Sequence, residues 1–285
     1  MGGVAVPGGG LSLTCARARW RRLTLWAWIV AVTLAFAGHG AGAAADGWQL
    51  DLQSEQTDPS GTVTFRQLQA RHPGGEIVRV WLALASPAQV RCRVIVQTSR
   101  PFDSVRAAVE QNGAAAGVNG GYFKEDGSPV GLLVSGGRQW HPFEKARLLS
   151  GVFFVRAGRP YIRRLGSAPP APLDAAIQCG PLLVERGEPV TGLNDTRVAP
   201  RTFVLQTGQG KVGIGILRAT TLARTAQILQ AHDFLQGDRV VIALNLDGGA
   251  STGFFGRTKD GSLDEPEWAR IADCLVLSPE KADFR

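Results

Sequence analysis

Apolar and polar residues alternate over many short stretches of the chain. This two-residue period is the pattern of a β-strand that buries one face. A first strand is predicted in this way at Thr62–Leu68. Further strands are predicted, in chain order, at Ile77–Leu84, Val90–Gln97, Ala114–Asn119, Gly131–Val134, Val152–Arg156, Tyr161–Arg164, Pro181–Val184, Thr202–Gln206, Val212–Leu217, Val240–Leu246 and Ile271–Leu277.

Two turns between these strands read as hairpins. Ser86-Pro87 lies between the second and third strands, which we expect to pair. Gly208–Gly213 satisfies the G-x-G-x-x-G pattern of a dinucleotide loop. That loop must open a helix, whereas apolar residues alternate after Val212 as in a strand. We therefore predict a hairpin turn there and no cofactor.

Two segments carry the helical period instead. The first begins with an N-cap at Asp103 or Ser104 and closes at Asn112-Gly113, and the second runs from Thr221 to Gly237. Each is followed by a predicted strand that ends in Asn and two glycines. The predicted fold class is α+β: a single domain of mixed β-sheet packed with a few helices. Its two helix–strand units end in Asn/Gly-rich loops, which we expect at one crevice.

The first 45 residues have the pattern of an export signal. A basic block contains four arginines between Arg17 and Arg22, the apolar run Leu23–Ala37 follows, and Ala43–Ala45 offers a cleavage site. We predict a signal peptide at 1–45, a mature domain at 46–285, and a secreted or periplasmic protein without a stable membrane span. An uncleaved anchor is the alternative.

Charge and cysteine content restrict the function further. Removing the four leader arginines lowers the net charge from +7 to +3, which argues against a nucleic-acid partner. Cys92, Cys179 and Cys274 stand far apart in the mature chain, and we interpret all three as small core residues, although two of them would be able to pair. No Cys/His spacing resembles a metal site, so neither metal nor cofactor is predicted.

Two glycine-rich strand ends carry the candidate chemistry. At the first, Asn119 is predicted to orient a ligand, Gly120 and Gly121 to bring backbone N–H groups close to it, and Tyr122 to face a sugar ring. A turn with an aromatic plug is the alternative. At the second, NLDGGAST, the catalytic candidates are Asp247 and Asn245. The substrate-binding candidates there are Gly248, Gly249, Ser251 and Thr252.

Two further residues are candidates for substrate contacts. Arg201 enters a strand in Ala-Pro-Arg-Thr, and its guanidinium offers a planar fork to a phosphate. His141 follows Trp140 and is a candidate for a sugar subsite. Both are equally compatible with ordinary structural roles.

These motifs, taken in order, resemble the phosphodiester glycosidase family. The resemblance rests on Asn119–Phe123, Gly180–Leu183, Ala199–Thr202 and Asn245–Thr252, and extends over about Ile77 to Leu277. It implies hydrolysis of a sugar–phosphate bond at the anomeric carbon. The expected function is therefore an exported hydrolase that cleaves a sugar 1-phosphodiester of an envelope or extracellular glycan.

The number of acids leaves alternatives open. Ordinary glycosidases use two carboxyl groups, but here Asp247 alone occupies a strong motif. Candidates for a second acid are Glu125, Asp126, Glu144 and Asp195. A non-catalytic polysaccharide-binding protein of the envelope and a phosphodiesterase that cuts the P–O bond are the alternative functions.

Overall fold

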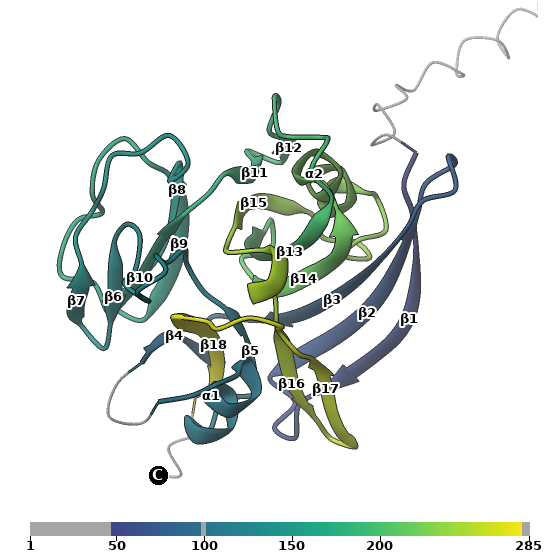
Figure 1. Cartoon of the computed structure of the whole chain (residues 1–285). Helices are drawn as coiled ribbons and strands as arrows, with labels where there is room; N and C mark the ends of the chain where they lie inside the picture. Colours follow the sequence, from purple (N-terminus) through teal and green to yellow (C-terminus); the bar gives the residue numbers. More distant parts are fainter. Residues whose placement is uncertain (1–46, 98–100, 281–285) are drawn as a thin grey trace, which may run out of the picture. The chain divides into compact units, whose positions relative to one another are not determined.

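Antiparallel β-strands make up most of the regular secondary structure in the described chain (Figure 1). The structure is a computed structural model that describes residues 47–97 and 101–280. The predicted signal peptide at 1–45 lies outside the described residues. Within them, no helix is long and apolar enough to cross a membrane.

The strands are arranged in three sheets. Sheet I has the order β1 (Gln49–Thr57), β2 (Val63–Arg71), β3 (Ile77–Ala85), β14 (Val212–Thr220), β13 (Ala199–Thr207), β15 (Val240–Asn245), β11 (Leu182–Glu185) and β12 (Glu188–Pro189). Sheet II has the order β7 (Arg138–His141), β6 (Leu133–Ser135), β10 (Ala175–Cys179), β8 (Gly151–Arg156) and β9 (Arg159–Arg164). Sheet III has the order β17 (Gly261–Glu265), β16 (Phe254–Thr258), β5 (Ala116–Asn119), β18 (Asp273–Pro279) and β4 (Val90–Val96).

The α+β class is confirmed, but the predicted mixed sheet is wrong. Every ladder between the described strands is antiparallel. Short alternating strands with many glycine turns suit antiparallel pairing, which needs no long crossover between neighbours.

The main core lies between the sheets. Phe65 of β2, Phe153 of β8 and Phe254 of β16 are fully buried in one apolar cluster that draws on all three sheets. The rings of Phe65 and Phe254 meet edge to face, with centroids 6.4 Å apart. Burial of such a side chain stabilises the fold by about 1.5–3 kcal/mol.

The two α-helices cover separate sheets (Figure 1). Helix α1 (Val105–Gln111) packs Ala108 and Val109 against Val276 of sheet III. Ser104 is its N-cap, because its hydroxyl accepts a hydrogen bond from the Ala107 N–H at 3.1 Å.

Helix α2 (Leu222–Gln230) buries Ala226, Ile228 and Leu229 against sheet I. It is shorter than predicted. Ala231 is already extended at φ −60° and ψ 139°, so the helix ends seven residues before Gly237. Leu235, which belongs to the predicted helical pattern, is buried from a turn instead, and so is Phe234.

The predicted hairpin at Ser86-Pro87 is also wrong. Strand β3 pairs with β2 and β14 in sheet I, whereas β4 pairs with β18 in sheet III. All residues from Trp81 to Ala85 are buried, so this part of β3 behaves as a central strand with a partner at each edge. The chain therefore changes sheets at the turn. Gly208–Gly213, in contrast, does form the predicted hairpin turn between β13 and β14.

The three cysteines of the described chain are buried, as predicted, and the pairing that the sequence left open is not formed among them. Cys179 ends β10 directly before Gly180, and Cys274 of β18 pairs with Asn119 of β5.

Candidate active site

The loops after β5 and β15 are joined directly, although the two strands belong to different sheets. Asn119 donates from Nδ2 to the Asp247 carbonyl at 2.8 Å. The Asp247 N–H in turn donates to the Gly120 carbonyl at 3.0 Å. These two bonds hold the two glycine-rich segments side by side and fix the backbone that carries the Asp247 carboxylate.

Asn119 is the centre of this junction. Its side chain is 1% exposed, and its Oδ1 accepts from the Thr202 hydroxyl at 2.7 Å and from the Gly253 N–H at 3.2 Å. Asn119 therefore links β5, β13 and the loop after β15. Thr252, also fully buried, adds its hydroxyl at 3.3 Å from that of Thr202.

Asp247 is half-buried and held by its own loop. Its Oδ1 accepts from the Gly248 N–H at 2.9 Å, and its side chain also bonds to Ser251. Burial raises the pKa of Asp247, and the bonds from Ser251 and Gly248 offset part of this increase. Gly249 has φ +67°, which a glycine adopts readily, and begins the short 3₁₀-helix η1 (Gly249–Ser251) that places Ser251.

Asn245 and Tyr122 join the two glycine-rich loops to Gly180, which follows β10. The Tyr122 hydroxyl donates to the Gly180 carbonyl at 2.6 Å, and Asn245 Nδ2 donates to the same carbonyl at 3.0 Å. Gly180 itself has no room for a side chain, because a Cβ there would lie 2.3 Å from the Leu148 carbonyl. Asn245 Oδ1 is buried and has no hydrogen-bond partner within the described part of the chain.

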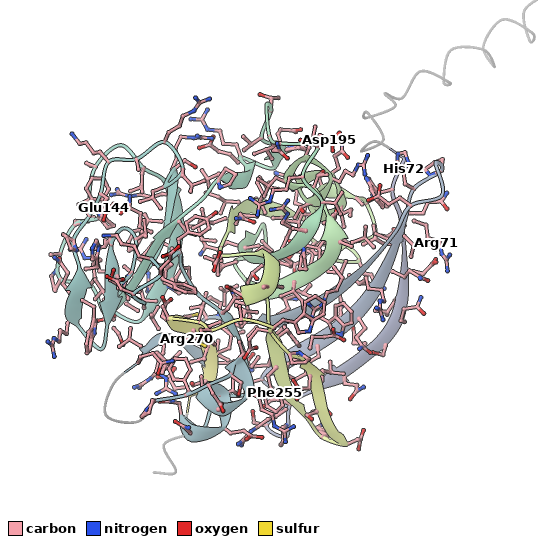
Figure 2. The ribbon with its side chains drawn as sticks, in the orientation of Figure 1. Arg71, His72, Glu144, Asp195, Phe255 and Arg270 are labelled. Carbon is pink, nitrogen blue, oxygen red and sulfur yellow. The ribbon has the colours of Figure 1, made fainter. Side chains whose placement is uncertain are left out.

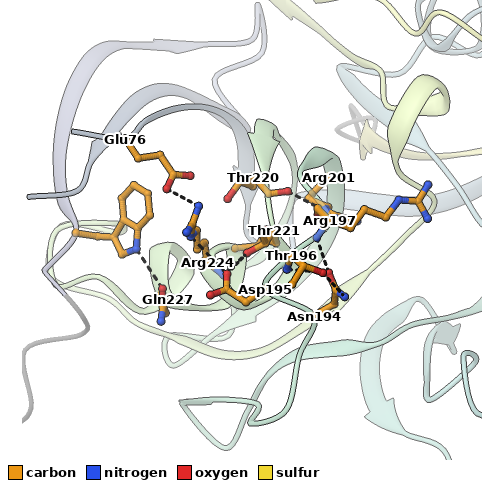
Figure 3. Close-up of polar contacts among 12 residues, drawn as sticks. Glu76, Asn194, Asp195, Thr196, Arg197, Arg201, Thr220, Thr221, Arg224 and Gln227 are labelled. Carbon is orange, nitrogen blue, oxygen red and sulfur yellow. Dashed lines mark hydrogen bonds and ion pairs between the residues drawn. The ribbon is translucent and has the colours of Figure 1, made fainter. Parts of the chain in front are cut away.

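Arg201 is a buried cation beside the Asp247 loop. Its side chain is 8% exposed, its Nε donates to the Thr220 carbonyl at 3.1 Å, and it also donates to the Arg197 carbonyl (Figure 3). A Cβ on Gly248 would lie 4.0 Å from Arg201 Cδ, so the guanidinium stem runs next to the residue that follows Asp247.

Arg201 lacks a compensating acid. No carboxylate of the described residues lies within 4.0 Å of its guanidinium nitrogens. Burial, followed by the neighbouring Arg197, lowers the pKa of Arg201. Buried charges are normally paired, so this guanidinium is suited to an external anion.

Sequence reasoning missed Asp273, the first residue of β18. Asp273 is 1% exposed, and its Oδ1 accepts from the Gly121 N–H at 3.0 Å while its carbonyl accepts from the Gly120 N–H at 2.8 Å. A Cβ on Gly120 would lie only 1.8 Å from Asp273 Oδ1, so this glycine makes room for the carboxyl group. An acid inside the apolar run IADCLVL is the signal that would have identified it.

The other acids proposed from the sequence have different partners. Asp195 accepts from Thr221 at 2.7 Å and pairs with Arg224 at 3.4 Å beside α2 (Figure 3). Asp126 caps its own turn through Ser128. Figure 2 shows Glu144 and Asp195 on different parts of the fold.

His141 lies at the edge strand β7 of sheet II. Its Nδ1 is 3.0 Å from the Gly131 carbonyl and 3.5 Å from Glu144 Oε1. These contacts connect it with Gly131 and Glu144 rather than with Asp247, so its place in a sugar subsite stays a prediction. In residues 47–97 and 101–280, no three His, Cys, Asp or Glu side chains are grouped as metal ligands.

Comparison with known proteins gives a family and a fold. A family model described as phosphodiester glycosidase matches residues 112–278, a range that contains both glycine-rich loops, Arg201 and Asp273. No curated protein matches the chain.

Two solved structures are similar to it. The catalytic domain of zebrafish N-acetylglucosamine-1-phosphodiester alpha-N-acetylglucosaminidase, auto-inhibited by its pro-peptide, superposes with a TM-score of 0.57 at 17% identity, covering 85% of this chain and 86% of that chain. A hypothetical protein from Synechocystis has a TM-score of 0.55 at 15% identity, covering 81% and 68%. At these identities the likeness establishes the shared fold.

Proposed function

Because the chain belongs to the phosphodiester glycosidase family, we propose that it hydrolyses the bond between the anomeric carbon of a sugar and a phosphodiester group. The family indicates a hydrolase of the glycosidase type. The zebrafish relative is named for N-acetylglucosamine 1-phosphodiesters. We infer the wider class of sugar 1-phosphodiesters for this chain, with an envelope or extracellular glycan as the source.

The observation that supports this proposal is that Arg201 packs next to Gly248, the residue that follows Asp247. Asp247 is a half-buried carboxylate, and Arg201 is a buried guanidinium without a carboxylate partner in the described chain. A sugar 1-phosphodiester offers both groups a target: the anomeric carbon for the acid and the anionic phosphate for the cation. A Cβ on Gly249 would meet nothing within 4 Å, so the backbone at Gly249 is open to such a ligand, whereas Gly248 lets its loop pack against the Pro200 carbonyl.

The chemistry needs little more than these two groups. In the direct route, Asp247 accepts a proton from water while the water oxygen attacks the anomeric carbon. The bond between the anomeric carbon and the bridging phosphate oxygen breaks, and its electron pair stays on that oxygen. Arg201 stabilises the charge that develops there. The products are a free sugar and a phosphate monoester, and because this leaving group is a weak base, strong protonation by a second acid is not required.

A covalent route uses the same residues. Asp247 then attacks the anomeric carbon itself, and water hydrolyses the glycosyl–Asp247 ester in a second step. The two routes differ in stereochemistry, since the direct route inverts the anomeric carbon and the covalent one retains its configuration.

Asn119 and Asn245 act as positioning residues in this proposal. Both side chains are almost fully buried, and their amide groups donate to protein oxygens rather than facing a ligand. The Gly120 carbonyl accepts from the Asp247 N–H, and Ser251 holds the Asp247 carboxylate.

Hydrolysis in H₂¹⁸O tests this function against its alternatives. The protein is incubated with a panel of sugar 1-phosphodiesters, with Asp247→Asn as the matched control. We expect ¹⁸O in the released sugar. Label in the phosphate would instead assign a phosphodiesterase that cuts the P–O bond. Binding of the panel without turnover by the parent protein would assign a non-catalytic glycan-binding protein.

A further inference from the structure

Asp273 stands behind the glycine turn that holds Asp247. Its carboxyl Oδ1 and its carbonyl receive the N–H groups of Gly121 and Gly120, and the Gly120 carbonyl receives the Asp247 N–H. A continuous chain of hydrogen bonds therefore runs from Asp273 through the turn to Asp247. The missing side chain of Gly120 is the space that the Asp273 carboxyl occupies.

The second carboxyl oxygen of Asp273 is unusual. Oδ2 is buried and has no hydrogen-bond partner among the described residues. An ionised carboxylate with a bare buried oxygen would lose much of its hydration without compensation, which favours the neutral acid. The bond from Gly121 to Oδ1 is available to both forms, since either one offers an acceptor.

The groups around Asp273 do not supply a cation that would keep it ionised. Asp247 is the charged neighbour, and it carries the same sign. Burial, and then the charge of Asp247, raise the pKa of Asp273 to about 7, although the bond from Gly121 lowers it in part. Burial also raises the pKa of the other ionisable groups facing this region, namely Tyr122, Cys179, Cys274 and Glu267.

We propose that Asp273 is a positioning residue of the active site whose neutral form holds the glycine turn and Asp247, and whose ionisation switches the site off. This inference rests on the proposed function. When Asp273 ionises, a second negative charge lies close to that of Asp247, and the site repels an anionic phosphodiester. Turnover should therefore fall as the pH rises, in addition to any fall at acid pH caused by protonation of Asp247.

Asp273→Asn isolates the charge. Asn keeps an oxygen acceptor for the Gly121 N–H and nearly the same shape, but it cannot ionise. In the parent protein, we expect kcat/KM to fall about tenfold per pH unit above the midpoint of a single ionisation. In Asp273→Asn this alkaline fall should disappear while activity near neutral pH persists.

Glu267→Gln is the matched control. Glu267 is another partly buried carboxyl with a raised pKa, caused chiefly by burial, but it accepts from Val105 at the start of α1 instead of from the glycine turn. This variant should keep the alkaline fall. Loss of the fall in Glu267→Gln but not in Asp273→Asn would overturn the assignment.

A measurement without substrate separates this inference from the proposed function. Carbon-13 NMR of labelled aspartate carboxyls follows Asp273 directly in the parent and in Asp247→Asn. We expect a midpoint near neutral pH in the parent and one lower by about one pH unit in Asp247→Asn, the low end for removal of a like charge nearby. An unchanged midpoint would refute the coupling even in an active enzyme. The expected shift in a protein without hydrolytic activity would refute only the function.

Discussion

The amide of Asn119 donates to the main-chain carbonyl of Asp247 at 2.8 Å, across 128 residues of sequence. The bond joins sheet III to the loop that leaves sheet I, so the position of the candidate nucleophile or base depends on a residue in another sheet. A second hydrogen bond, from the Asp247 N–H to the Gly120 carbonyl, joins the same two loops. Both glycine-rich motifs are therefore parts of one structure rather than two independent turns.

Asn119→Ala should destabilise the fold strongly. The substitution leaves the Asp247 carbonyl and the Gly253 N–H without their partner in a buried place. Each unsatisfied group costs about 1–3 kcal/mol, and in a domain of this size Tm falls by about 2–4 °C per kcal/mol. Asn112→Ala, which removes one amide bond at the end of α1, is the control and should change Tm much less. Equal shifts in differential scanning calorimetry would contradict a central role for Asn119.

Asp247→Asn should remove activity and leave the fold intact. Asn is nearly isosteric and still accepts from the Gly248 N–H, but it neither attacks carbon nor takes a proton from water. The expected loss in kcat is at least ~10²-fold, the low end for positioned acid–base catalysis. Turnover of a sugar 1-phosphodiester and Tm are measured on the same preparation. A variant with near-parent turnover and a lowered Tm would show that Asp247 serves only its own turn.

Arg201→Lys should weaken turnover although it keeps the charge. The planar guanidinium of Arg201 donates to the Thr220 and Arg197 carbonyls and has N–H groups left for a phosphate. The single ammonium group of a lysine cannot reach all three partners. Loss of a preorganised donor typically costs ~10²-fold in kcat. Inorganic phosphate should compete with substrate less strongly in this variant than in the parent. Arg91→Lys, at an exposed ion pair with Glu280, is the control. The same inhibition constant in all three proteins would place the anion elsewhere.

Export should remove the first 45 residues. The basic block, the apolar run and Ala43–Ala45 predict that the mature protein begins at Asp46. N-terminal sequencing of protein recovered outside the cytoplasm checks this. A sequence that begins before Leu23 would instead show an uncleaved anchor.

Local patterns in the sequence were sufficient for most strands and for the two loops. The strand before Asp247 is predicted at Val240–Leu246 and lies at Val240–Asn245. The N-cap is predicted at Asp103 or Ser104 and lies at Ser104, because the short side chain of a serine accepts a hydrogen bond from a nearby backbone N–H. Strand β1 was not predicted. Five of its nine residues are exposed and the other four are intermediate, in no regular alternation, because it lies at the edge of sheet I.

Long-range pairing was beyond the reach of these patterns. The turn at Ser86-Pro87 is compatible with a hairpin or a change of sheet, and only the partners of β3 and β4 decide. Asp273 was missed for a similar reason. Its importance comes from its bonds to Gly120 and Gly121, about 150 residues away in sequence, and an acid within the apolar run IADCLVL does not by itself indicate these partners.

Asp273→Asn and Asp58→Asn should change the pH dependence of stability in opposite directions. Burial raises the pKa of Asp273 to about 7 in the folded protein, whereas an Asp in the unfolded chain has a pKa of about 4. Between these two pH values, the folded protein keeps a proton on Asp273 that the unfolded chain has lost. Stability from this group is complete below the unfolded pKa and is lost as the pH rises toward 7. Asp273→Asn should therefore flatten the decline in Tm between pH 4 and pH 8.

Asp58 has the opposite signature. Burial opposes its ionisation, but hydrogen bonds from Ser60, Val63 and Thr62 outweigh burial and lower the pKa of Asp58. Its stabilisation is present above the unfolded pKa and is lost as the pH falls through the folded one. Asp58→Asn should therefore lower Tm more at pH 7 than at pH 3. Thermal unfolding of both variants is measured between pH 3 and pH 8. If the change in Tm follows the same pH trend in both variants, Asp273 is not neutral in the folded protein, because an ionised carboxylate would behave as Asp58 does.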